Sequence, residues 1–189
     1  MQSLRIKLAA GVAVLGVAGV ATAAIAHDRS RMDAFLTGYQ EPPAISTGAN
    51  GSFKAQINRG EDEIRYSLVY NGPFNPGATT PTAVTQAHIH IGQLSINGGI
   101  SVWLCGTANV QPAPTVPKPP DCPAPGVPVT GTLTPDHVVG PGGQGIQAGE
   151  FAELVRALRA GVAYANVHTT THPGGEIRGQ ISDDRGRDH

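Results

Sequence analysis

Apolar and polar residues alternate with a period of two in several short segments of the chain, which is typical of half-buried β-strands. In residues 51–57, Phe53, Ala55 and Ile57 fall on one face. Residues 64–70 alternate in the same way, and the turn between the two segments predicts a β-hairpin. Further strands are expected at residues 32–39, 84–91, 100–105 and 129–133.

One segment has the period of an amphipathic helix instead. In residues 149–160, apolar residues recur at i, i+3, i+4 and i+7 from Phe151, and Gly161 follows as a helix stop. We expect this helix to cover an edge or an end of the strands. The pattern therefore predicts an all-β fold, a Greek-key or jelly-roll-like antiparallel β-sandwich with one short packed helix.

The last two predicted strands, residues 162–168 and 176–181, flank a turn rich in proline and glycine. This composition predicts a second hairpin, in which Gly174 and Gly175 supply positive φ angles. Glu176 and Arg178 share one face of the second strand. Their opposite charges favour an ion pair or a bidentate hold on a loop, which would fix the hairpin. A catalytic carboxylate, or a carboxylate that orients a metal-binding histidine, is the alternative for Glu176.

Residues 1–26 have the pattern of a signal peptide. Two basic residues precede an apolar run, and small residues ending at Ala23 or Ala26 offer two cleavage sites. An uncleaved membrane anchor is the alternative, since the uncharged run approaches the roughly 20 residues that span a bilayer. In both cases we expect an exported protein, periplasmic or secreted, with no membrane contact after cleavage.

The remaining chain is loop-rich and slightly acidic. The whole sequence has 13 basic and 14 acidic residues, and the signal peptide holds two of the basic ones. The absence of a basic run elsewhere argues against nucleic acid as a partner. We expect one domain at residues 33–182, followed by a charged tail at 183–189.

Cys105 and Cys122 are the two cysteines of the chain. In an exported protein such a pair favours a disulfide, here across a loop that has eight prolines in residues 111–128. A thiolate metal site is the competing interpretation, without a third cysteine to support it.

The histidines are the main candidates for chemistry. His88 and His90 are two residues apart in a predicted strand, so they share a face with Val84 and Gln86, and that face is either a site or solvent-exposed. Imidazoles without thiolates suit copper(II) and zinc. Hydrogen bonding alone is the alternative role. The candidate ligands are His88, His90, His168 and His172, with His27 added if cleavage after Ala26 makes it the new N-terminus.

Four motifs occur in order along the chain: FLTGYQEPP with TGANG at 35–51, AHIHIG at 87–92, YANVHT at 164–169, and HPGGEIRGQ at 172–180. This set resembles the CHRD domain, a module repeated in chordin and found singly in exported bacterial proteins. The resemblance covers residues 33–181 and implies an extracytoplasmic β-rich domain. Growth-factor binding by chordin is credited to neighbouring cysteine-rich modules, which this chain lacks.

The HxHxG strand is also similar to the copper strand of Cu/Zn superoxide dismutases. The similarity covers His88, His90 and Gly92, with His168 as a third ligand, and finds no counterpart of the dismutase's bridging histidine or zinc loop. Three hypotheses follow. The first is a non-enzymatic exported binding module with a histidine-based copper or zinc site and an extracellular protein partner. The second is a copper redox or dismutase-like enzyme, and the third is a structural or adhesive domain without metal.

Overall fold

The computed structural model describes residues 31–74 and 83–183 of the chain. The predicted signal peptide, His27 and the tail beyond Asp183 lie outside these residues. The strands of the described part are β1 (Arg31–Thr37), β2 (Asn50–Ile57), β3 (Ile64–Asn71), β4 (Val84–Ile91), β5 (Gly99–Cys105), β6 (Val129–Leu133), β7 (Ala163–Thr169), β8 (Ile177–Gln180) and β9 (Ser182–Asp183), and its α-helix is α1 (Phe151–Arg159).

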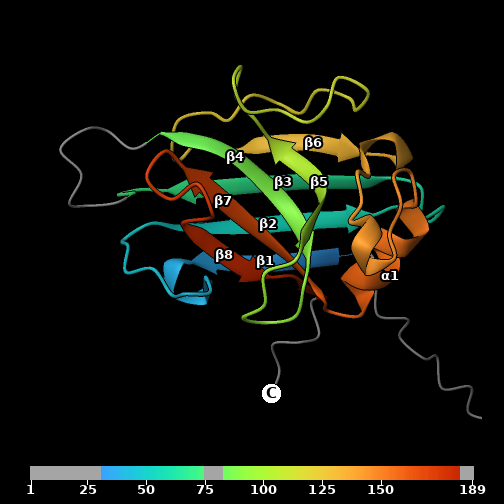
Figure 1. Ribbon diagram of the computed structural model, residues 1–189, viewed down its shortest axis with the longest axis horizontal. Coiled ribbons are helices and arrows are strands. Elements are labelled where there is room, and N and C mark those ends of the chain that lie inside the picture. The colour runs from blue at the N-terminus through green and yellow to red at the C-terminus, as the bar shows by residue number, and fades with distance from the viewer. Residues whose placement is uncertain (1–30, 75–82, 184–189) are drawn as a thin grey trace, which may run out of the picture.

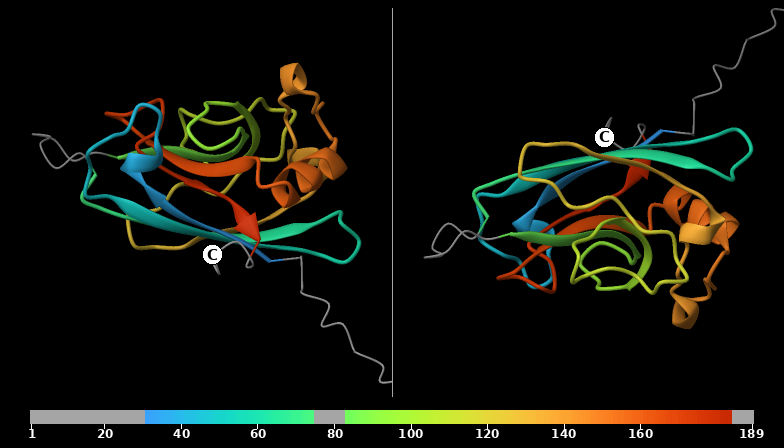
Figure 2. Two further views of the ribbon diagram at one scale, coloured as in Figure 1. Left: turned by 90° about the horizontal axis from the view of Figure 1, so that it is seen from below. Right: turned by 90° about the horizontal axis from the view of Figure 1, so that it is seen from above.

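The strands form one antiparallel sheet in the order β5-β4-β7-β8-β1-β2-β3-β6, with β9 paired to β1. Figure 2 shows this sheet folded over on itself, so that β1, β2 and β3 make one layer and β4 and β7 the other. The predicted antiparallel β-sandwich with one helix is therefore confirmed. The two layers meet at β8 and β1, where Arg178 pairs with Thr37.

The core fills the space between the layers. The predicted β2–β3 hairpin is present, with Phe53 opposite Leu68 and Ile57 opposite Ile64. These side chains are at most 1% exposed. Burial of a large apolar side chain contributes about 1.5–3 kcal/mol, so this alternating face supplies much of the drive for folding.

The first strand is shorter than the predicted span 32–39. β1 stops at Thr37, and Gly38–Gln40 form a 3-10 turn. The chain turns here because Gly38 packs directly on the next segment: its carbonyl accepts a hydrogen bond from Ile45 N at 2.8 Å, and a side chain would collide with Ile45 and Thr47.

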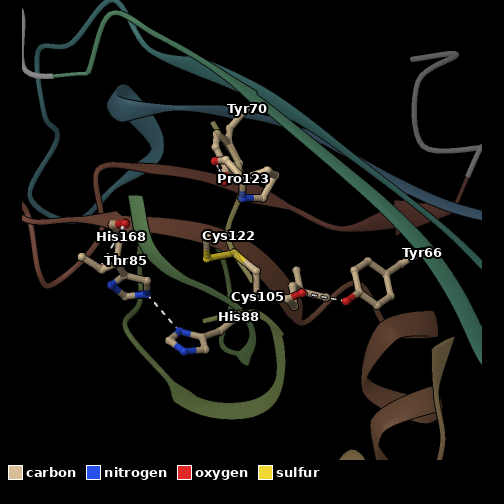
Figure 3. The surroundings of a disulfide bond; sticks show 9 residues. Tyr66, Tyr70, Thr85, His88, Cys105, Cys122, Pro123 and His168 are labelled. Atoms are coloured by element: carbon tan, nitrogen blue, oxygen red, sulfur yellow. Dashed lines mark hydrogen bonds between the residues drawn. A yellow bond between two sulfur atoms is a disulfide. The ribbon is translucent and has the colours of Figure 1, made fainter. Parts of the chain in front are cut away.

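The predicted disulfide between Cys105 and Cys122 is present and closes the proline-rich loop onto the edge strand β5. Two tyrosine hydroxyls of β3 tie the same region to the opposite layer (Figure 3). Tyr66 donates to the carbonyl of Leu104, and Tyr70 donates to that of Pro123, each at 2.6 Å. The loop is thereby anchored at both of its ends.

The helix α1 lies at one end of the sandwich (Figure 1). It occupies 151–159 of the predicted 149–160, after Gly149 at φ 84° and before Gly161 at φ 68°. Its apolar stripe is buried, as the pattern predicts, and Arg159 forms an ion pair with Glu61 of the β2–β3 turn at 2.7 Å. The helix thus covers the end of the core.

Candidate metal centre

Strands β4 and β7 bring together histidines that are far apart in the sequence. The two strands pair antiparallel, with His88 opposite Asn166 and Gln86 opposite His168. Directly opposed residues of an antiparallel pair lie on the same face of the sheet, so the polar residues of both strands gather on the face that looks away from the core.

This outer face is buried at the histidines, because the loop 92–98 covers it. Gly98 contributes a carbonyl to His90 at 2.9 Å and an N–H to the Tyr164 hydroxyl at 3.1 Å. The predicted sharing of a face by Val84 and the histidines is wrong. A bulge between Val84 and Gln86 shifts the alternation by one residue, and Val84 joins the core.

The imidazoles of His88, His90 and His168 form one cluster. Each offers a ring nitrogen, and these three nitrogens lie within 4.8 Å of one another. The exposed fractions are 0%, 7% and 6%. Among residues 31–74 and 83–183, this is the one group of three or more histidine, cysteine or acidic side chains with metal-binding spacing.

Backbone carbonyls fix the orientation of two of these rings. His90 Nδ1 lies 2.9 Å from the Gly98 carbonyl oxygen, and His168 Nδ1 lies 2.9 Å from that of Pro173. Because a carbonyl only accepts, Nδ1 carries the proton in both rings, and Nε2 keeps its lone pair. Histidine ligands of metals are commonly held in this way.

Burial keeps the cluster uncharged. Desolvation lowers the pKa of His88 to about 2 and that of His90 to about 4, and the neighbouring histidines add to both shifts. Burial also lowers the pKa of His168, against the hydrogen bond to Pro173. Neutral imidazole is the form that coordinates metals.

Asn166 lies against the same cluster, 2% exposed. Its Oδ1 is 3.0 Å from His168 Nε2, and His88 Nδ1 is also 3.0 Å from that nitrogen. With the proton of His168 on Nδ1, Nε2 accepts a hydrogen bond from His88 Nδ1–H, and the amide oxygen is a second acceptor in contact with that nitrogen. A cation bound at this point would coordinate both atoms once the His88 proton has moved from Nδ1 to Nε2, which has no hydrogen-bond partner among the described residues.

A buried carboxyl group and a buried guanidinium lie behind Asn166. Glu41 accepts a hydrogen bond from the Asn166 side chain and is close to Arg178, and burial raises the pKa of this carboxyl to about 7 in spite of both. The Arg178 guanidinium lies 3.3 Å above the Tyr164 ring and donates to the Gln93 carbonyl at 2.9 Å. Glu41 and Arg178 thus fix the position of Asn166 and of the covering loop.

His172, the fourth predicted ligand, lies outside the cluster. Its Nδ1 is 3.2 Å from Glu176 Oε2. The Glu176 carboxylate also accepts hydrogen bonds from Thr47 at 2.8 Å and Thr169 at 2.7 Å. The Glu176 carboxylate thus contacts Thr47, Thr169 and His172, whereas the Arg178 guanidinium contacts Tyr164 and the loop at Gln93. Glu176 joins the hairpin to the segment after β1.

Several residues of the site were missed by the sequence reasoning. Asn166 is two residues before His168, so its place on the histidine face could have been found from strand alternation. Glu41 stood in a recognised motif, but nothing local indicated that it reaches the hairpin. Trp103 packs on His88 with ring centroids 4.2 Å apart, and its strand follows the histidine strand directly. His137 is remote, capping the turn at Thr134.

No helix among residues 31–74 and 83–183 has the length and apolar character needed to cross a membrane. Searches of curated proteins and of solved structures find no match. The model of one family, described as the CHRD domain, matches residues 32–181, which include all three clustered histidines, Glu41 and Arg178. The chain belongs to the CHRD domain family.

Proposed function

We propose that this protein is an exported, non-enzymatic binding module that holds one copper or zinc ion on His88, His90 and His168. The observation that carries the proposal is the approach of three buried imidazole nitrogens to within 4.8 Å of one another. Nitrogens that share a tetrahedral ion at about 2.0 Å lie roughly 3.3 Å apart. Small side-chain shifts bridge that difference.

The donor set favours copper or zinc over other ions. Imidazole nitrogen is a borderline ligand that suits these two metals, whereas calcium and magnesium prefer sites built from oxygen. The carbonyls of Gly98 and Pro173 already orient two of the rings, which lowers the cost of ordering them when the ion binds. The disulfide supports an exported protein, because oxidising compartments preserve such bonds.

The burial of the three histidines favours a binding role over catalysis. A copper redox or dismutase-like enzyme needs an open coordination position that solvent and substrate reach. The three histidines are at most 7% exposed, and the loop 92–98 covers them. We therefore place the redox enzyme second to the binding module.

Calorimetric titration of the metal-stripped protein with Cu(II) and Zn(II) tests the proposal. We expect one site per chain with an affinity tighter than micromolar. His88→Ala and His168→Ala should each weaken binding by about 10-fold or more, because each removes a ligand.

His172→Ala is the matched control, since it removes a histidine of the same hairpin that lies outside the cluster. It should leave the affinity unchanged. A wild-type protein that binds neither ion would overturn the proposal and favour the purely structural role of the histidines.

A further inference from the structure

We infer that Asn166 is the fourth ligand of the histidine site and that its amide oxygen makes the site prefer divalent ions to Cu(I). This inference rests on the proposed function and deepens it, because it names the feature that selects the bound ion. Its basis is the position of one buried oxygen beside a ring nitrogen of the histidine cluster.

The amide oxygen faces a ring nitrogen that has no proton to give. Asn166 Oδ1 lies 3.0 Å from His168 Nε2, and the other nitrogen of that ring is engaged by the Pro173 carbonyl. His168 Nε2 accepts a hydrogen bond from His88 Nδ1 at 3.0 Å, but its contact with the amide oxygen joins two acceptors, which is unfavourable inside a protein. An ion bound to both atoms turns this contact into two metal–ligand bonds.

The Asn166 amide oxygen is held in place by contacts of the amide nitrogen on the side away from the histidines. The amide nitrogen of Asn166 donates to Glu41, whose carboxyl group lies near Arg178. The backbone of Gly175 passes close to both groups: a Cβ there would come within 2.6 Å of Glu41 Oε1 and 2.9 Å of Asn166 Nδ2. Rotation of the amide would point its oxygen at the carboxylate, so the oxygen stays with the histidines.

An amide oxygen changes which ion fits. It is a harder donor than imidazole, and hard donors favour Cu(II) and Zn(II), whereas Cu(I) prefers soft ligands. Three imidazoles alone would serve Cu(I) well. The fourth, oxygen ligand therefore stabilises the divalent ions and adds little for Cu(I).

The test compares affinities for Cu(I), Cu(II) and Zn(II) in the wild-type protein, Asn166→Ala and Asn166→Asp, each measured by competition with a chelator of known affinity. Asn166→Ala should lose about 10-fold or more in Cu(II) and Zn(II) affinity and keep its Cu(I) affinity. Asn166→Asp keeps an oxygen beside His168 but loses the amide that donates to Glu41, so it should retain more divalent affinity than Asn166→Ala. His172→Ala should match the wild type for all three ions.

Three results would overturn the inference. An equal loss for all three ions in Asn166→Ala would show that the amide only supports the fold or donates to His168. Unchanged Cu(II) affinity would show that the oxygen is no ligand. A wild-type protein that binds none of the ions would overturn the proposed function itself, which separates the two failures.

Discussion

Trp103 packs edge-on against His88, with the ring centroids 4.2 Å apart and the planes at 87°. It is the one tryptophan of the chain, so the fluorescence of the protein reports on the surroundings of this histidine. The two residues are paired across β4 and β5, which keeps the indole beside the cluster.

This contact predicts a spectroscopic response to metals. One equivalent of Cu(II), an open-shell ion, should quench most of the tryptophan emission, and Zn(II), a closed-shell ion, should shift it without strong quenching. Fluorescence titration of the metal-stripped protein measures both effects. His90→Ala, which leaves the Trp103–His88 contact in place, should lose the response at one equivalent; full quenching in that variant would assign the copper to another place.

The turn of the second hairpin predicts different outcomes for two adjacent glycines. Gly175 has φ 123°, and a side chain there would collide with Glu41, whereas nothing lies within 4 Å of a Cβ at Gly174. Gly175→Ala should lower the free energy of unfolding by about 1–3 kcal/mol, and Gly174→Ala should change it by less than about 0.5 kcal/mol. Urea unfolding compares them, and equal losses would contradict the close packing at Gly175.

The strands and the helix could be predicted from the sequence, because one side of nearly every element faces a continuous core. Phe53, Leu68 and Leu154 each lie on the buried face that their periodicity indicates. The burial of the histidine face of β4 could not be predicted in this way. Alternation shows that His88 and His90 lie together, but only the tertiary path of the loop 92–98 decides that they are buried.

The candidate site was predictable to the extent that its members alternate within one strand. His88 and His90 form such a pair, and His168 was chosen for its place in a second strand. His172 was predicted as a ligand because it follows His168 by four residues. The turn between them instead places its side chain against Glu176, outside the cluster. The place of Glu41 in the site depends on a contact between segments more than 100 residues apart, and no local sequence pattern indicates such a contact.

Glu41 predicts a dependence of stability on pH. Burial raises its pKa from 4.5 to about 7 in the folded protein. Between these values the folded protein keeps a proton that the unfolded chain has released, so this group lowers the stability as the pH rises from about 4.5 to about 7, with no further change above. The loss amounts to about 3 kcal/mol at most, at about 1.4 kcal/mol per pKa unit.

Glu41→Gln isolates this effect, since the histidines titrate in both proteins. The difference in unfolding free energy between the variant and the wild type should shift in favour of the variant between pH 4.5 and 7. Urea unfolding in a chelating buffer at several pH values measures it. A difference that stays constant over that range would show that Glu41 titrates normally.

The disulfide predicts a loss of stability on reduction. Cys105 and Cys122 are 17 residues apart, and the chain-entropy model assigns a loop of this size about 3 kcal/mol. The double variant Cys105→Ala, Cys122→Ala should therefore unfold at lower urea concentration, as should the reduced wild type. The tyrosine hydrogen bonds from β3 should keep the loop in place, so metal affinity should be nearly the same; a large drop in affinity would contradict this separation.

The hydrogen bond between His88 and His168 joins residues that are 80 positions apart in the sequence. Because of this separation, the histidine cluster forms only when the chain folds. An unfolded chain offers the His88–His90 pair alone, and the third imidazole arrives only after β7 has docked on β4. The unfolded chain therefore lacks the complete cluster, and an ion would be bound there only after the two strands have paired. From then on the ion would favour the folded state by mass action, since the unfolded chain binds it poorly.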